Sequence, residues 1–297
     1  MTYQELYDQI RHQMEEAGCD SPAFEADCLL EDIGGLPHLQ RALYMNEIVP
    51  EPIRQEVETA VRQRINGRPL QYILKMWNFL SLSLHVGEGV LIPRPETELL
   101  CEWGADWLKK NKLSAPVVWD LCAGTGCVGL GLRTLYPEAR VTVVEYSEAA
   151  CYYLRHNCTD YKELGVRMLR ADITQDVPEL KRKADLILCN PPYIPTADLA
   201  GLMTEVQYEP VMALDGSEDG LKFYRVLAER WVPRLKSGGM MAVEIGIDQT
   251  EPVVALFKQA GLQSIQVLQD YSGIDRVVSG DPDPATYYQY GAADGAA

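Results

Sequence analysis

The sequence predicts an α/β protein in which a doubly wound, mostly parallel sheet follows a small helical domain. From about Glu96 onward, short apolar segments typical of buried strands alternate with segments of helical period. The first 75 residues show helical period alone, and residues 76–94 change to a period of two. We therefore expect an N-terminal helical domain over 1–75, a β-hairpin linker over 76–94, and the sheet domain over 95–280.

The N-terminal helices are predicted from their apolar faces and their end signals. Leu6, Ile10 and Met14 recur four residues apart, as on one face of a helix. A second helix is expected to start at Ser21-Pro22 and to stop at Gly34-Gly35, and a third is expected from about Glu51 to Asn66-Gly67. In the linker, WNFLSLSLHV alternates, Gly87-Glu88-Gly89 supplies a turn, and VLIP follows, so a hairpin turning at these glycines is expected.

Seven apolar segments are expected to form the strands of the sheet. They are PVVWDLC, VTVVEYS, RMLRADI, ADLILC, MMAVEIG, SIQVLQD and DRVVSG, starting at residues 116, 141, 167, 184, 240, 264 and 275. Helices are expected near 126–136, 149–158, 218–235 and 249–260. The short turn from Tyr271 to Ile274 indicates an antiparallel edge, and ligands are expected at the carboxyl ends of the strands. Residues 281–297 lack periodicity and are expected to be a disordered tail.

Composition and charge exclude several classes of protein. The 27 Lys and Arg against 43 Asp and Glu give a formal charge of -16, which repels polyanions, so nucleic acid is not the expected ligand. No stretch of about 18 apolar residues occurs, and Met1 leads into a polar segment, so neither a membrane span nor a secretion signal is expected. The 8 Cys form no CxxC pair, which favours reduced thiols in a cytoplasmic protein without a metal site.

A glycine-rich loop between a strand and a helix indicates a nucleoside site. In the loop from Asp120 to Gly129, Gly124 and Gly126 can let backbone amides approach a ligand. Glu145 ends the next strand, where a carboxylate can bind two ribose hydroxyls. The spacing of Gly124, Gly126 and Gly129 also fits the dinucleotide fingerprint, so the loop alone leaves NAD and S-adenosylmethionine open. Asp172 follows the third strand and is expected either to bind the adenine amino group or to be a loop acid.

The segment Asn190-Pro191-Pro192-Tyr193 points to methyl transfer onto an amide or amino nitrogen. It follows the buried strand ADLILC, at the mouth of the expected ligand crevice. The prolines stiffen the backbone and remove two donors, which leaves the Asn190 side-chain oxygen and the Pro191 carbonyl as acceptors. Two acceptors can hold the two hydrogens of a weakly nucleophilic nitrogen in line with a methyl donor, and Tyr193 can stack on a planar amide. A hydride-transfer enzyme has no use for this pair, which favours S-adenosylmethionine over NAD.

With these motifs in place, the chain resembles the PrmC/HemK enzymes, the peptide chain release factor N(5)-glutamine methyltransferases. The resemblance rests on an ordered set of segments over residues 1–280: GRPLQYIL, VLIPRPETELL, DLCAGTGCVGL, NPPYIP, YEPVMALDGSEDGL and DYSGIDRVV. NPPY alone is shared with DNA and ribosomal N-methylases. The resemblance implies a seven-stranded Rossmann-like methyltransferase fold and, as substrate, the glutamine of the GGQ motif in bacterial class I release factors. It also implies that the helical domain docks the release factor and that the enzyme is a monomer that converts S-adenosylmethionine to S-adenosylhomocysteine.

The resemblance also implies roles for individual residues. Asn190, Pro191, Pro192 and Tyr193 would grip the substrate amide, and Arg94 to Thr97 would close one wall of the pocket. The residues expected at the cofactor are Arg94, Thr97, Ala123, Gly124, Thr125, Gly126, Glu145, Asp172, Ile173 and Asn190.

Two departures from the family pattern concern the size of the pocket. Cys122 and Ala123 stand at the start of the glycine loop, where the family usually begins with glycine, and Glu145 stands where Asp is common. Three other functions stay open at this point: a nucleic-acid N-methylase, which the missing basic face disfavours, an NAD oxidoreductase and a non-catalytic scaffold.

Overall fold

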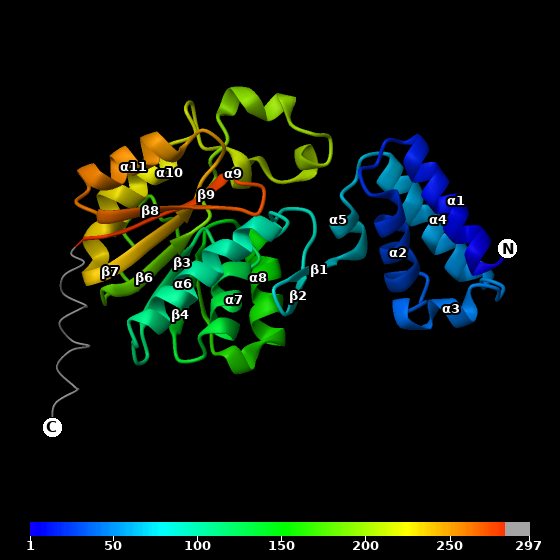
Figure 1. The fold of residues 1–297 in the computed structure, drawn as a ribbon, viewed down its shortest axis with the longest axis horizontal. Coiled ribbons are helices and arrows are strands. Elements are labelled where there is room, and N and C mark those ends of the chain that lie inside the picture. Colours follow the sequence, from blue (N-terminus) through cyan, green and yellow to red (C-terminus); the bar gives the residue numbers. More distant parts are fainter. Residues whose placement is uncertain (283–297) are drawn as a thin grey trace. The chain divides into compact units, whose positions relative to one another are not determined.

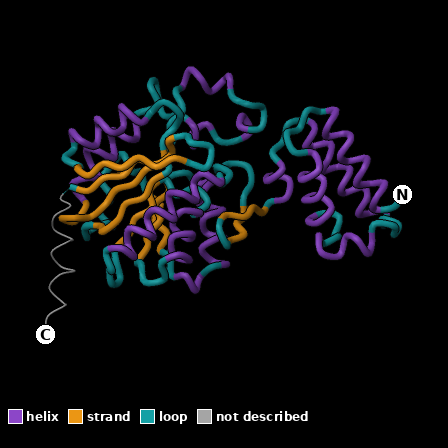
Figure 2. Tube along the Cα trace, viewed as in Figure 1, coloured by secondary structure: helices purple, strands orange, loops and turns teal. Residues whose placement is uncertain are grey.

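The computed structural model describes residues 1–282, which divide into two compact units. The first unit comprises Met1–Met76 together with the returning segment Met203–Tyr208. The second comprises residues 77–202 and the chain from Glu209 onward. Figure 1 colours both along the sequence, and Figure 2 separates helices from strands. Each unit is described by itself below.

The first unit is helical. Its helices are α1 (Tyr3–Glu16), α2 (Pro22–Asp32), α3 (Arg41–Tyr44), α4 (Glu51–Ile65) and α5 (Leu70–Leu74). Leu6, Ile10 and Met14 are all buried, which confirms the face predicted for the first helix. Thr2 begins α1 with a capping box, in which its hydroxyl accepts from the Glu5 amide and the Glu5 carboxylate accepts from the Thr2 amide.

A buried ion pair joins the helices of the first unit. The Arg64 side chain, 4% exposed, donates from Nε and Nη2 to the two carboxylate oxygens of Glu25 at 2.5 and 2.8 Å. A second carboxylate, Glu205 of the returning segment, lies 2.5 Å from the same guanidinium. Tyr208 adds a hydrogen bond from its hydroxyl to the Asn66 carbonyl at 3.3 Å. The returning segment is therefore fastened to α4 by charge and by hydrogen bonding.

A two-stranded sheet follows, formed by β1 (Met76–Phe79) and β2 (Leu82–His85). The hairpin is present, and the expected turn forms at Gly87-Glu88-Gly89, but it follows the hairpin rather than joining its strands. The strands meet at Leu80, and VLIP forms no strand. Leu80 turns the chain with a φ of 51°, a conformation that a leucine rarely adopts. Its amide donates to the Glu98 carboxylate at 2.7 Å, which helps to hold this turn.

The second unit contains a seven-stranded sheet in the order β5-β4-β3-β6-β7-β9-β8, which confirms the predicted fold class. The strands are β3 (Val117–Leu121), β4 (Arg140–Glu145), β5 (Arg167–Arg170), β6 (Ala184–Cys189), β7 (Leu235–Glu244), β8 (Gln263–Gln269) and β9 (Asp275–Asp281). The pairs among β3 to β7 are parallel. The strand β9 lies between β7 and β8 and runs antiparallel to both.

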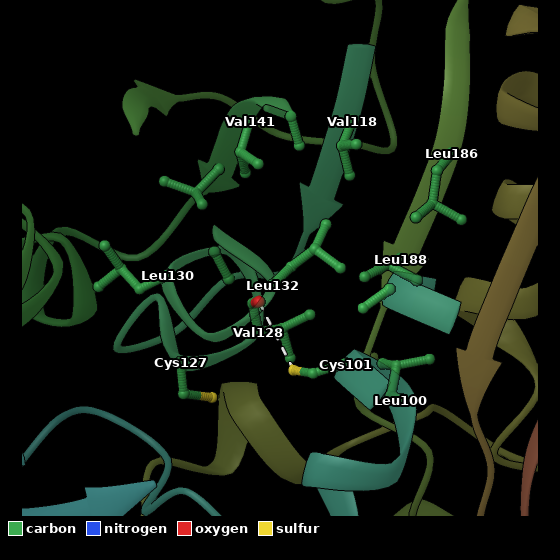
Figure 3. Packing of buried hydrophobic residues seen from close by; sticks show 14 of the residues in the cluster. Leu100, Cys101, Val118, Cys127, Val128, Leu130, Leu132, Val141, Leu186 and Leu188 are labelled. Carbon is green, nitrogen blue, oxygen red and sulfur yellow. Dashed lines mark hydrogen bonds between the residues drawn. The ribbon is translucent and has the colours of Figure 1, made fainter. Parts of the chain in front are cut away.

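Helices cover both faces of this sheet (Figure 1). The helices α6 (Glu98–Lys110), α7 (Cys127–Leu135) and α8 (Glu148–Asp160) pack apolar side chains against one face, in the cluster that Figure 3 draws in part. The buried Cys101 thiol lies within this cluster, 3.5 Å from the Val128 carbonyl. The other face is covered by α10 (Lys222–Val226) and α11 (Thr250–Gln259), and a short helix α9 (Val211–Leu214) precedes them. The two apolar layers fix the sheet, and the loops at its carboxyl edge hold the site.

The long helix expected near 218–235 is broken into three parts. After α10 the chain widens into a π-helical turn over Leu227–Trp231 and then tightens into a 3-10 turn over Val232–Arg234. Pro233 has no amide to continue an α-helix, which explains why the helix ends here. The displaced Trp231 ring is buried and donates from Nε1 to the Ile173 carbonyl at 2.9 Å. The broken helix thus reaches a loop beside the cavity described below.

Two further predictions concern the C-terminal tail and a membrane span. Asp281 still belongs to β9, and residues 283–297 of the expected tail lie outside the described residues. None of the helices in residues 1–282 combines the length and apolar character needed to cross a bilayer.

Candidate active site

The two motifs singled out in the sequence leave neighbouring strands side by side. Leu121 at the end of β3 is paired with Cys189 at the end of β6. The order of strands reverses between β3 and β6, because β4 and β5 lie on one side of β3 while β6 and β7 lie on the other. In an open α/β sheet, such a switch point leaves a crevice at the carboxyl edge. The glycine loop and the NPPY segment both open onto it.

A cavity of about 430 Å³ occupies this crevice. A volume of a few hundred Å³ is typical of sites for small molecules and cofactors. Most of the predicted site residues line it: Arg94, Thr97, Ala123, Gly124, Thr125, Glu145, Asp172, Ile173, Asn190 and Pro192. Among the described residues, Gly126, Pro191 and Tyr193 do not line the cavity, although all three were predicted at the site.

The two glycines of the loop are needed for different reasons. Both have positive φ, 56° at Gly124 and 84° at Gly126. A Cβ on Gly124 would meet only a Val90 methyl, at 3.9 Å, so it would project into cavity space. A Cβ on Gly126 would lie 2.5 Å from Leu154, inside the packed layer under α8. Gly124 keeps room for a ligand, whereas Gly126 lets the loop pack against the protein.

Glu145 ties the second strand to the glycine loop. Its carboxylate oxygens accept from the amides of Gly124 at 2.8 Å and Ser147 at 2.7 Å. Burial raises the pKa of Glu145, and these backbone hydrogen bonds lower it. Each oxygen keeps a second lone pair, so the side chain can still accept from hydroxyls of a ligand in the cavity.

Asp172 lines the cavity beside Ile173, but part of its carboxylate has a local partner. Its Oδ1 accepts from the amide and the hydroxyl of Thr174, both at 2.8 Å. At this oxygen Asp172 therefore has the local hydrogen bonds of a loop acid, which was one of its two predicted roles. The buried Ile173, 4% exposed, presents an apolar side chain at the same wall of the cavity.

The start of the glycine loop carries the two departures noted in the sequence. Cys122 has a φ of 61°, in the region that favours glycine, and it lines the cavity with Ala123. Beneath them, Asp120 accepts from the Gly129 amide at 2.8 Å through Oδ2. Its Oδ1 has no hydrogen-bond partner among the described residues, and burial raises the pKa of Asp120 to about 8. The space for a ligand persists although neither Cys122 nor Ala123 is a glycine.

The side chain of Asn190 is oriented by a buried hydroxyl. Its Nδ2 donates to Oγ1 of Thr97 at 3.2 Å, and that hydroxyl donates to Oε2 of Glu244 at 2.6 Å. The other carboxylate oxygen of Glu244 accepts from the Tyr193 hydroxyl at 3.4 Å. Since Nδ2 donates to Thr97, Oδ1 of Asn190 is the atom left to accept a hydrogen bond from a ligand. Tyr193 is thus directed at Glu244 rather than at the cavity.

A turn from a distant part of the sequence supports the NPPY segment. The Ile194 amide donates to the Leu214 carbonyl at 2.9 Å, and the Gly216 amide donates to the Ile194 carbonyl at 2.8 Å. A Cβ on Gly220 would lie 2.4 Å from the Tyr193 carbonyl oxygen. The same oxygen accepts from Nε2 of Gln249 at 2.8 Å. The segment ALDGSEDGL therefore packs tightly against NPPY.

Arg94 is held at the opposite wall by a buried carboxylate. Glu209, 4% exposed, forms an ion pair with the Arg94 guanidinium and accepts from the Ile92 amide at 2.9 Å. Glu209, Glu244 and Gln249 were not predicted at the site. The sequence could have indicated Glu244, because a carboxylate inside the apolar strand MMAVEIG is expected to be buried and a buried carboxylate needs hydrogen-bond partners.

No group of three or more His, Cys, Asp or Glu side chains within residues 1–282 is arranged to hold a metal ion. The 8 cysteines are free thiols.

Comparisons with known proteins bear on the fold and the family of the chain. The model of the PrmC N-terminal domain matches residues 5–74, and the model of the methyltransferase small domain matches residues 103–205. A methyltransferase structure from Pyrococcus furiosus aligns with a TM-score of 0.51 at 15% identity, over 76% of this chain and 99% of that one. A 16S rRNA N2 G1207 methyltransferase from T. thermophilus aligns with a TM-score of 0.50 at 20% identity, over 69% of this chain and 49% of that one. These structures share the fold.

Relatives that match over nearly their full length identify the family more closely than these structures do. A release factor glutamine methyltransferase of Geobacter sulfurreducens is 37% identical over 94% of this chain and 96% of its own length. One of Bifidobacterium longum is 34% identical over 93% of this chain and 98% of its own length. The sheet, the glycine loop and the NPPY segment at the switch point define a methyltransferase of the Rossmann-like class. Within that class, the chain belongs to the release factor glutamine methyltransferase family.

Proposed function

We propose that this enzyme transfers a methyl group from S-adenosylmethionine to the side-chain amide nitrogen of the GGQ glutamine in bacterial class I release factors. The observation that carries the proposal is the orientation of Asn190, whose Nδ2 is bound to Thr97 while the residue lines the cavity. This arrangement leaves a side-chain oxygen to accept a hydrogen from a carboxamide. The family membership supports the same substrate class.

The cavity offers S-adenosylmethionine open space and hydrogen-bond acceptors. Gly124 leaves open the space that a Cβ would fill, and Glu145 has lone pairs for the two ribose hydroxyls. Asp172 and Ile173 offer an acceptor and an apolar surface for an adenine ring. When bound, the cofactor supplies an electrophilic methyl group on a sulfonium.

The residues of the chain then act by holding the acceptor nitrogen. The Asn190 oxygen accepts one amide hydrogen, and the Pro191 carbonyl is the proposed acceptor for the other. A carboxamide nitrogen held by both hydrogens can be aligned toward the methyl group, and it can lose a proton after methylation. Tyr193, the last residue of the segment, is proposed to help keep the segment in place through the hydrogen bond from its hydroxyl to Glu244. No general base is required before transfer.

The helical unit is proposed to dock the release factor. Several of its apolar side chains are strongly exposed, with Leu39 94%, Leu43 77%, Ile48 69% and Phe24 54% exposed. Exposed apolar side chains that lie together often mark protein interaction sites, and this is the reason for proposing the helical unit as the docking surface. Deleting several of them should therefore raise the KM for the release factor more than the KM for the cofactor.

Mass spectrometry of an intact release factor after incubation with enzyme and S-adenosylmethionine tests the proposal. One added methyl on the GGQ glutamine is expected, and Asn190→Ala should lower the rate at least about 100-fold. The affinity of that variant for S-adenosylhomocysteine should change less than about 3-fold. Unchanged turnover in Asn190→Ala, or methylation of nucleic acid instead of the release factor, would contradict the proposal.

A further inference from the structure

Glu244 is a buried acid that no step of the proposed reaction uses directly. It is 2% exposed, lies at the end of the interior strand β7, and does not line the cavity. A carboxylate in such a place is costly unless it is well hydrogen-bonded. Its partners are the hydroxyls of Thr97 and Tyr193. Through them it reaches both ends of the NPPY segment.

The direction of each hydrogen bond in this network follows from the charge of Glu244. An ionised carboxylate can only accept, so the single proton of the Thr97 hydroxyl must point to Glu244, at 2.6 Å. The lone pairs of Thr97 then accept from Asn190, which selects the Nδ2 end of that amide at 3.2 Å. The oxygen of Asn190 is consequently the end that stays available at the cavity.

We propose that Glu244 is a positioning residue for methyl transfer, which acts through the Thr97 hydroxyl to hold the Asn190 amide with its oxygen toward the substrate. The inference rests on the proposed function. It adds two residues, Thr97 and Glu244, that determine which end of the Asn190 amide faces the substrate. Protonation of Glu244 would reverse the chain of donors. A neutral carboxyl can donate to Thr97, whose proton then turns to Asn190 and favours the flipped amide.

The surroundings of Glu244 allow such a protonation near neutral pH. Burial raises the pKa of Glu244 to about 7, and the Thr97 hydrogen bond and the charge of Arg276 oppose the increase. The groups that face it are Arg276 on β9, Glu96 beside Thr97, the Tyr193 hydroxyl, Tyr224 on α10 and Cys127 on α7. Arg276 is itself fixed by Asp270, which accepts from its Nε at 2.8 Å.

Steady-state kinetics on a release factor test the network. Thr97→Val removes the hydroxyl without changing the size of the side chain. We expect kcat to fall at least about 10-fold in this variant. The KM values and the affinity for S-adenosylhomocysteine should change less than about 3-fold. Thr97→Ser, which restores a hydroxyl, should recover most of the lost rate. The matched control is Thr134→Val on α7, whose hydroxyl bonds the Gly131 carbonyl away from the cavity.

Two further results separate positioning from a general loss of structure. In an Asn190→Ala background, Thr97→Val should have no further effect, because the two residues act through one amide. In the wild type, kcat should fall as the pH drops through about 7, and Glu244→Gln should have a low kcat without this pH dependence. Independent losses in the double variant, or the same pH profile in Glu244→Gln, would overturn the inference.

A readout without turnover keeps the inference separate from the proposed function. The side-chain amide signals of Asn190 can be identified in a ¹⁵N NMR spectrum by their loss in Asn190→Ala. They should shift as the pH passes through about 7 in the wild type and should not do so in Thr97→Val. If the release factor is not methylated but the signals behave in this way, the proposed function fails and the positioning network stands. Signals of Asn190 that ignore both changes would refute the network.

Discussion

The amide of Gly124 donates a 2.8 Å hydrogen bond to the carboxylate of Glu145, so the glycine loop and the end of β4 are joined directly. Both residues line the same cavity. The glycine loop therefore holds in place the carboxylate that is proposed to bind the ribose hydroxyls.

We expect Glu145→Ala to raise the Kd for S-adenosylhomocysteine at least about 10-fold, because a charged acceptor of two hydroxyl protons and the anchor of Gly124 are lost together. Isothermal titration calorimetry measures the change. Glu148→Ala is the matched control, since Glu148 lies on the same segment with a side chain 83% exposed and pairs only with Arg170 among the ion pairs described. An equal Kd for Glu145→Ala and the wild type would remove Glu145 from the cofactor site.

Gly220→Ala should damage the site through the backbone of Tyr193. The new Cβ would lie 2.4 Å from the Tyr193 carbonyl oxygen and 2.5 Å from Nε2 of Gln249, so the NPPY segment would have to move. We expect methyl transfer to fall about 10-fold, together with a lower Tm. Gly261→Ala separates the two causes, because Gly261 also has positive φ, 92°, but a Cβ there meets nothing within 4 Å. A similar loss of activity in both variants would show that close packing under Tyr193 is unimportant.

Asp120 should make the stability of the protein increase as the pH is lowered from about 8. Burial raises its pKa from 3.8 to about 8, so between these values the folded state binds a proton that the unfolded state lacks. Stability from this group is greatest at low pH and is lost as the pH rises toward 8, by about 1 kcal/mol per pH unit. Urea unfolding at pH 8.5, 7.5 and 6.5 should show this slope. Asp120→Asn, which can still accept from Gly129, should have a shallower slope.

Arg64→Ala should strongly destabilise the helical unit. The substitution leaves the carboxylate of Glu25, 7% exposed, without its guanidinium partner, at a cost of about 3 to 5 kcal/mol. The double variant Arg64→Met with Glu25→Leu should recover much of this loss, because an apolar pair needs no compensation. Arg62→Ala on the same helix is the control, and thermal unfolding followed by circular dichroism is the measurement. A small effect of Arg64→Ala would mean that the ion pair is dispensable.

The sheet and most of its helices could be predicted because buried parallel strands are continuous apolar segments. ADLILC is buried along its whole length, as its composition indicates. The hairpin turn at Leu80 could not be predicted, since a leucine with positive φ gives no turn signal and depends on a contact with Glu98, 18 positions away. The helix before β7 breaks near Pro233, and this proline was already visible in the sequence.

The loops that form the site were predicted from the sequence, but the buried residues that hold their side chains in place were not. Gly124, Glu145 and Asn190 meet because parallel strands end at one edge, which the order of elements already implies. Glu244 and Glu209 meet the site only through tertiary contacts, at separations of 147 residues from Thr97 and 117 from Ile92. Tyr193 was expected to face the substrate, and its distant partner Glu244 directs its hydroxyl elsewhere.

The place of β9 between β7 and β8 has a consequence for how the chain is made. Within residues 1–282 the last strand in sequence is an interior one, so β7 keeps a bare hydrogen-bonding edge until Asp281 has been synthesised. A product that stops short of Val277 would expose that edge and the apolar layer beneath it, which are features that promote aggregation and degradation. The interior of the sheet is thereby closed by a segment that follows the glycine loop by about 150 residues in the sequence.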